Sequence, residues 1–162
     1  MRVWDRVVEA AILVAVAVTI LMVVLINADV FARTVLGTPI HLAVELTTFG
    51  FALTTFLPLV VVAREGREIA FDLIKSRMTG VAEKLLKILF NAAGATAILI
   101  IFWPVAKKVV WAYQVGDYIP SSPILYTVVP WAAIAIGLLL YALEQIRQVV
   151  VLTRSLFVSP AA

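Results

Sequence analysis

The sequence contains no cysteine and a single histidine, His41, among its 162 residues. These absences exclude disulfides, thiolate metal sites and iron–sulfur clusters, and one histidine cannot supply the two ligands of a bis-histidine haem. Charged residues make up only 14% of the chain, where about 25% is usual for a soluble domain. Hydrophobic residue types reach 64%, against about 45–50% ordinarily. This composition predicts a membrane protein, so the net charge of +3 indicates contact with membrane lipids and not with nucleic acid.

Four charge-free apolar stretches are long enough to span a bilayer, because about 20 helical residues cross roughly 30 Å of hydrocarbon. These stretches cover residues 10–28, 46–63, 88–106 and 122–143, and the last lies in a longer charge-free run that begins at 118. The first is longer than the apolar part of a secretion signal, about 7–15 residues, so we expect it to remain as a helix. The sequence therefore predicts an all-α integral membrane protein in which residues 1–162 form a single four-helix transmembrane domain.

Lysine and arginine are distributed unevenly between the connections. With the amino terminus inside, only Arg33, Lys107 and Lys108 of the thirteen Lys and Arg residues lie outside. Because cytoplasmic connections are enriched in these residues, both termini are predicted to be cytoplasmic.

The connection between the second and third spans, residues 64–87, is the only one with room for structure of its own. On a helical wheel, the apolar residues of 68–79 fall on one broad arc and most polar residues on the other. This pattern predicts a short amphipathic helix over 68–79 that lies in the inner membrane interface and ends at Gly80.

Groups that could carry chemistry are scarce in the spans. Every Asp, Glu, Lys, Arg and His lies at a predicted span boundary or in a connection. Because ionisable residues inside a membrane mark proton relays, ion sites and substrate contacts, their absence disfavours a self-sufficient ion-coupled transporter. No phosphate-binding glycine loop, metal-ligand cluster or nucleophile with its base is recognisable, so neither an enzyme nor a cofactor is expected.

Proline and small residues indicate how the spans pack. Pro58, Pro104 and Pro130 disrupt regular hydrogen bonding in the second, third and fourth spans and predict kinks or tilts there. Residues 92–97, which include Gly94, form a nearly side-chain-free face on the third span. Another helix, from the same chain or from a partner, can approach closely at such a face.

Two segments carry a family pattern. Glu45 opens the second span, and the span ends in Arg64-Glu65-Gly66-Arg67-Glu68-Ile69-Ala70-Phe71-Asp72-Leu73-Ile74. The fourth span begins with the entry segment Ser122-Pro123-Ile124-Leu125 and carries Pro130, Trp131 and Gly137. Both segments resemble the DctQ-like small membrane subunit of tripartite ATP-independent periplasmic (TRAP) transporters, and the spacing from Glu45 to Asp72 fits without a gap. The chain departs from the family pattern at Val44, Thr48, Pro58 and Glu68, where the family usually has an acid, an arginine, a glycine and a histidine.

The resemblance implies a three-part uptake system in the bacterial inner membrane. A periplasmic binding protein delivers an organic anion to a large, sodium-coupled elevator subunit, and the small subunit enlarges the stationary frame without binding substrate. The outer connections, 29–45 and 107–123, could contact the binding protein. On this basis the residues expected to serve structure or the partner interface are Glu45, Arg64, Gly66, Ile69, Asp72, Gly94, Pro123, Pro130 and Trp131.

Several roles stay open at this point. Asp72 could pair with Arg64 or Arg67, cap the interfacial helix, or simply be solvated. Glu45 could bond the partner subunit or merely favour the amino terminus of its helix.

Two other classes of function compete with the scaffold. Four-span units could oligomerise into a self-contained channel or small transporter, which would need a polar lumen lined by Thr54, Thr55 and Asn91. A membrane anchor for a redox enzyme is the third reading, and the single histidine weakens it.

Overall fold

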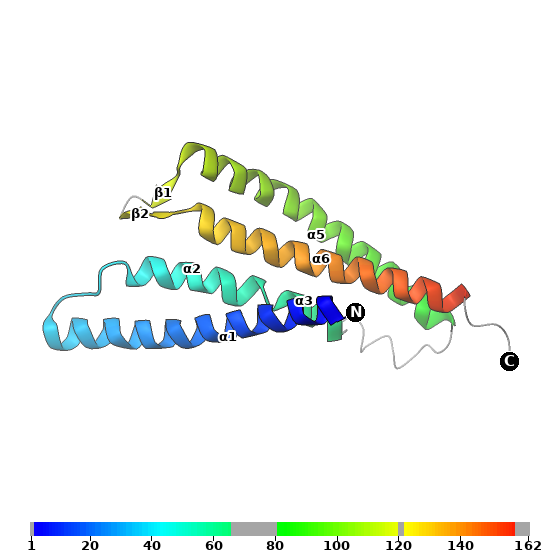
Figure 1. The fold of residues 1–162 in the computed structure, drawn as a ribbon, viewed down its shortest axis with the longest axis horizontal. Helices are drawn as coiled ribbons and strands as arrows, with labels where there is room; N and C mark the ends of the chain where they lie inside the picture. Colours follow the sequence, from blue (N-terminus) through cyan, green and yellow to red (C-terminus); the bar gives the residue numbers. More distant parts are fainter. Residues whose placement is uncertain (1, 66–80, 120–121, 158–162) are drawn as a thin grey trace.

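The computed structural model describes residues 2–65, 81–119 and 122–157. The amino-terminal part contains α1 (Arg2–Phe31), the short π-helix η1 (Ala32–Leu36), α2 (Ala43–Phe56) and α3 (Leu59–Glu65). The carboxy-terminal part contains α5 (Val81–Val115), β1 (Tyr118–Ile119), β2 (Ser122–Tyr126) and α6 (Val128–Phe157). Figure 1 shows two helical hairpins side by side, one formed by α1 with α2 and α3 and the other by α5 with α6.

Within the described ranges, four helical segments are long and apolar enough to cross a membrane, as the sequence predicted. They are Trp4–Leu36, Ala43–Glu65, Val81–Val115 and Val128–Leu156. The segments extend beyond the charge-free stretches, because polar and charged residues continue the helices at their ends. The fourth differs at its start, since residues 122–126 form strand β2 and the helix begins only at Val128. Pro123 lies in this strand, and a proline disfavours helical backbone in the residue before it.

Pro58 breaks the second span into two helices, as its lack of an amide N–H predicted. Helix α2 ends at Phe56 and α3 begins at Leu59. At the break, the N–H of Leu57 still donates to the carbonyl of Leu53 at 3.1 Å, and the N–H of Val61 donates to the carbonyl of Pro58 at 2.9 Å. The second span is therefore two short helices joined by a turn.

The other two prolines leave their helices continuous. Pro104 lies inside α5, which runs on to Val115. Pro130 lies in the first turn of α6, where a missing N–H costs little because that group has no partner within the helix.

Small residues fill the interior, and large apolar residues cover the outside. Most of the buried hydrophobic residues are alanines, and three of the larger ones, Val8, Leu57 and Val60, form a cluster with Ala11 where α1, α3 and α6 meet. Leucine, isoleucine, valine and tryptophan side chains are exposed along all four spans. This is the arrangement that helices adopt in lipid, where close backbone approach at small residues replaces the hydrophobic effect as the cause of association.

The start of α1 and the end of α6 lie toward the same end of the bundle (Figure 1), as an even number of spans requires. The predicted interfacial helix, 68–79, lies outside the described residues, as do Gly66, Ile69 and Asp72.

Candidate functional site

A buried carboxylate lies at the end of the bundle where α1 begins. The side chain of Glu144 on α6 has no solvent-exposed surface. It accepts the indole N–H of Trp4 at 2.7 Å, the Nε and Nη2 groups of Arg147 at 2.8 and 2.6 Å, and the amide of Gln148 at 3.3 Å. The burial of a charge is tolerated only with such donors around it.

Local sequence explains why three of these groups meet. Glu144, Arg147 and Gln148 are spaced at i, i+3 and i+4 on α6, so they share one face of the helix. Trp4 comes from the first turns of α1 and lies 140 residues away in the sequence. The tertiary fold therefore supplies the fourth member.

Gln148 extends this polar network to the remaining spans. Its amide Nε2 donates to the backbone carbonyl of Ala63 on α3 at 2.5 Å, and its Oε1 accepts the side-chain amide of Asn91 on α5 at 3.3 Å. Asn91 is itself buried. Side chains or backbone groups of α1, α3, α5 and α6 are thus joined through Glu144 and Gln148, and we call this set of Trp4, Ala63, Asn91, Glu144, Arg147 and Gln148 the polar network.

Arg64, one of the residues expected from the sequence, lies near the network. It pairs with Asp5 of α1 at 2.5 Å, and both side chains are a little more than a third exposed. The pair therefore ties α3 to the start of α1 but is screened by solvent. The expected pairing of Asp72 with Arg64 or Arg67 lies outside the described residues.

Gly94 lies on α5 opposite Gln145 of α6. A Cβ atom placed on this glycine would lie 3.6 Å from the side-chain amide nitrogen of Gln145, an ordinary contact distance. Ala95 beside it is buried, whereas Ala93 and Ala97 are exposed. Part of the small-residue face thus packs on a helix of the same chain, and part of it remains open.

A second glycine marks a close approach between helices. Gly137 on α6 faces the α2–α3 break, where an added Cβ would collide with the backbone carbonyl of Phe56. Only glycine fits between α6 and this stretch of backbone without a shift of the helices.

The other expected residues lie at the opposite end of the bundle. Glu45 is in the first turn of α2 and is half-buried. Pro123 is in strand β2, and Pro130 and Trp131 are in the first turns of α6. The expected residues that the structure describes therefore form two groups and not one site.

A carboxylate also organises this opposite end. Asp29, mostly buried near the end of α1, accepts Arg33 Nε at 2.7 Å and the backbone N–H of Ile40 at 2.8 Å. Between these partners the chain turns through Gly37, and it enters α2 through Leu42; both have left-handed backbone with φ near 70°. Asp29 thus fixes the loop that leads into α2.

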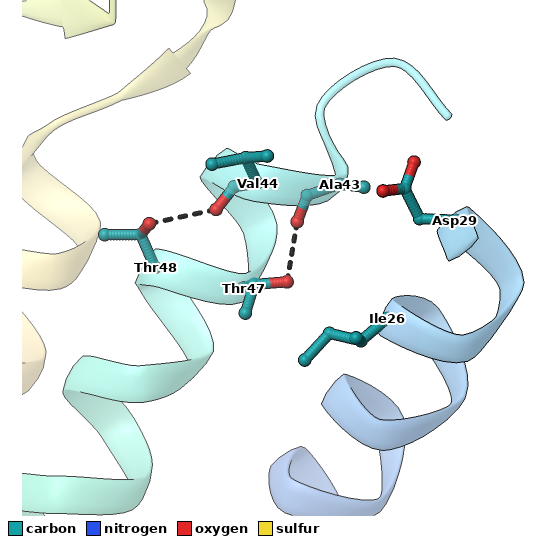
Figure 2. A pocket seen from close by; sticks show the side chains of 6 residues that line it. All are labelled: Ile26, Asp29, Ala43, Val44, Thr47 and Thr48. Carbon is teal, nitrogen blue, oxygen red and sulfur yellow. Dashed lines mark hydrogen bonds between the residues drawn. The ribbon is translucent and has the colours of Figure 1, made fainter. Parts of the chain in front are cut away.

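A surface pocket of about 260 Å³ lies beside Asp29, between α1 and α2. Figure 2 shows the Asp29 side chain reaching toward the start of α2, with Ile26 below it and Thr47 and Thr48 across the pocket. The two threonine hydroxyls donate to the backbone carbonyls four residues earlier, at 2.6 and 2.9 Å. The polar groups around the pocket are therefore engaged within the chain. Among the described residues, no group of three or more His, Cys, Asp or Glu could hold a metal ion.

The structure adds to one expectation from the sequence. Glu144 is expected at the boundary of the fourth span; helix α6 continues past it to Phe157, and the Glu144 carboxylate is fully buried within the protein. Sequence reasoning missed Glu144, Gln148 and the partnership with Trp4. The sequence feature that could have identified them is the i, i+3, i+4 spacing of Glu144, Arg147 and Gln148, which places three hydrogen-bonding side chains on one face of a helix.

The comparison with protein families decides the identity. The model of the DctQ component of the tripartite ATP-independent periplasmic transporters matches residues 22–155. The chain belongs to the DctQ family. DctQ components are small membrane subunits of TRAP transporters and act with a large membrane subunit and a periplasmic binding protein. The DctQ match includes Glu144, Arg147 and Gln148 but begins after Trp4 and Asp5. No curated protein and no solved structure matches the chain.

Proposed function

We propose that this DctQ component is a scaffold subunit. It braces the large, sodium-coupled elevator subunit of its transporter while that subunit imports an organic anion delivered by the periplasmic binding protein. The observation that carries the proposal is the polar network around Glu144. A carrier needs polar groups that can exchange partners with cargo, whereas the four donors around Glu144 all come from its own chain.

The same network supports a rigid frame. Hydrogen bonds between membrane helices contribute about 0.6–2 kcal/mol each, and here they connect α1, α3, α5 and α6 at one end. Between this end and the middle of the bundle, the contact of Gly137 with the α2–α3 break holds α6 against the second span. A subunit fixed in this way can keep a neighbouring elevator domain at constant depth and tilt.

The proposed orientation places the polar network on the cytoplasmic side of the bacterial inner membrane, with both termini there. Arg64, Lys84, Lys87, Arg147 and Arg154 belong to the helix ends on that side, as the enrichment of cytoplasmic segments in Lys and Arg favours. The segment 68–79 then acts as an interfacial arm on the cytoplasmic surface. The connections 29–45 and 107–123 face the periplasm and the binding protein.

The exposed apolar faces supply the contact area that a scaffold needs. Leu13 and Leu21 on α1 and Ile100 on α5 are each about two-thirds exposed. In the membrane such faces meet lipid tails or the large subunit. The subunit can therefore add surface to the frame without contributing to the substrate path.

The alternative, an oligomeric channel, lacks support from two of its three expected pore residues, Asn91 and Thr54. Asn91 is buried and donates to Gln148 of its own chain, so it does not line an open lumen. The hydroxyl of Thr54 donates to the backbone carbonyl of Phe51 at 3.2 Å, the local bond that threonine usually forms in a membrane helix.

Co-expression with the large subunit tests the scaffold. We expect the chain to co-purify with an affinity-tagged large subunit, and uptake into proteoliposomes to require both. Glu144→Gln should lower the amount of assembled complex and the maximal uptake rate, with an unchanged KM for the anion. Glu9→Gln is the matched control, because Glu9 is an exposed carboxylate on α1. A chain that purifies alone as a stable, monodisperse species, with full uptake by the large subunit in its absence, would refute the proposal.

A further inference from the structure

The outer half of α5 carries a groove that the rest of the described chain does not cover. The groove has a volume of about 350 Å³, and its lining residues all belong to α5: Trp103, Ala106, Lys107, Val110, Trp111 and Gln114. Trp103 is 64% exposed, and Val110 and Trp111 are about half exposed. The spacing of three or four residues between the lining positions places them on one face of the helix.

Two lysines accompany the groove. The ammonium of Lys107 lies 5.1 Å from the ring centre of Trp103, and that of Lys108 lies 3.7 Å from the ring centre of Trp111. Both are cation–π distances, and they hold the charges at the level of the indole rings. An indole and an ammonium together are typical of the membrane–water interface.

These two charges lack a carboxylate partner in the part of the chain that the structure describes. The only acidic residue of α5 is Glu83, at the far end of the helix, where it pairs with Lys87 at 2.6 Å. Asp117, which follows α5, accepts the hydroxyl of Thr127 at 2.7 Å. The outer end of α5 therefore presents two adjacent, uncompensated cations beside an apolar groove.

We propose that this groove binds one anionic phospholipid. The phosphate lies against Lys107 and Lys108, and an acyl chain lies on the membrane side of them, along the exposed face of Trp103. A phospholipid offers an anion and a hydrocarbon chain at adjoining depths, which matches the order of the lysines and Trp103 along α5. An acidic protein surface would engage the lysines but leave the groove between the indoles unfilled. The proposal requires only that α5 spans the membrane and does not depend on the scaffold role.

Native mass spectrometry of the detergent-purified complex with the large subunit tests the site, with phosphatidylglycerol and phosphatidylcholine as probes. Each basic side chain near a membrane surface contributes roughly a fivefold gain in affinity for anionic lipid, so the double variant K107Q/K108Q should lose about 25-fold in phosphatidylglycerol binding. Trp103→Leu should weaken binding of both lipids, because the groove loses one wall. Lys84→Gln, which removes a lysine at the other end of the same helix, should retain wild-type binding.

Three results would overturn the proposal. The first is unchanged phosphatidylglycerol binding in the double variant. The second is equal affinity of the wild-type complex for both lipids. In the third, the double variant keeps its lipid but no longer binds the periplasmic protein, which would identify the lysines as a protein-docking surface. Each readout is a lipid or protein affinity and not uptake, so a failure here is distinguishable from a failure of the scaffold proposal.

Discussion

The polar network makes a sharp prediction for Glu144→Gln, a change that keeps the size of the side chain and removes its charge. In the wild type, Oε1 accepts Arg147 Nη2 and Gln148 Nε2, and Oε2 accepts Trp4 Nε1 and Arg147 Nε. Glutamine replaces one of these oxygens by an NH₂ group. In either orientation of the amide, its NH₂ group takes the place of an oxygen that accepted two hydrogen bonds, so two donors lose their acceptor. One of them belongs to Arg147, and the other is the indole of Trp4 or the amide of Gln148.

The cost follows from where these two donors lie. A buried donor without an acceptor costs about 1–3 kcal/mol. The Arg147 side chain is 42% exposed, so its released N–H can bond to water or lipid headgroups and contributes less. The measured contribution of an interhelical hydrogen bond to the unfolding free energy in a membrane is also small, because the same groups find other partners in the unfolded state. We therefore expect Glu144→Gln to lower the free energy of unfolding by about 2 kcal/mol.

Reversible SDS unfolding in mixed micelles, followed by circular dichroism, measures this difference. Trp4→Phe removes a single donor and should cost about 1 kcal/mol. Glu9→Gln applies the same chemical change to an exposed carboxylate and should have almost no effect. If Glu144→Gln and Glu9→Gln differ by less than about 0.5 kcal/mol, a limit well below the cost of one unsatisfied buried donor, the network does not hold the bundle together.

Three further predictions test other contacts. Gly137→Ala should lower the unfolding free energy by about 1–3 kcal/mol, because α6 must move away from the α2–α3 break. Gly94→Ala should be neutral or slightly stabilising. Equal losses for the two variants in the same SDS titration would contradict the close packing of Gly137. Asp29→Ala should speed hydrogen exchange at the Ile40 amide. Asp29→Asn should not, because asparagine keeps an oxygen that can accept the amide N–H. Unchanged exchange in both variants would show that Asp29 does not fix the loop. Arg64→Gln should change the unfolding free energy by less than about 1 kcal/mol, since the Arg64 ion pair is exposed. A loss as large as that of Glu144→Gln would refute the prediction that this exposed pair contributes less than the buried Glu144.

The number of spans and the broken second span were predictable from the sequence. Long charge-free runs can be counted directly, and Pro58 removes a backbone donor wherever the helix is placed. The family pattern around Glu45 and Arg64 also led to the DctQ family, which the family comparison confirmed. These features depend on properties of single residues or on local order in the chain.

The polar network was not predictable in the same way. Counting charge-free residues treats each charge as the end of a span, so it placed Glu144 at a boundary. A carboxylate with four donors does not carry the cost of an isolated charge, and α6 therefore continues through it. The donor from Trp4 lies 140 residues away in the sequence, and no periodicity links the two. The sequence also left open which helix packs on the small-residue face at Gly94, because the spacing of residues along one helix does not identify its neighbour.

The two ends of the bundle are held by different kinds of contact. At the network end, Glu144 accepts a hydrogen bond from Trp4 of α1, and Gln148 accepts one from α5 and donates one to α3, so the two hairpins are joined to each other. At the opposite end, two carboxylates each close one hairpin on itself: Asp29 binds the loop before α2, and Asp117 binds Thr127 just before α6. Neither of these two contacts joins one hairpin to the other. Relative movement of the hairpins should therefore pivot about the polar network, so the network end is where a frame for a moving partner is most firmly fixed.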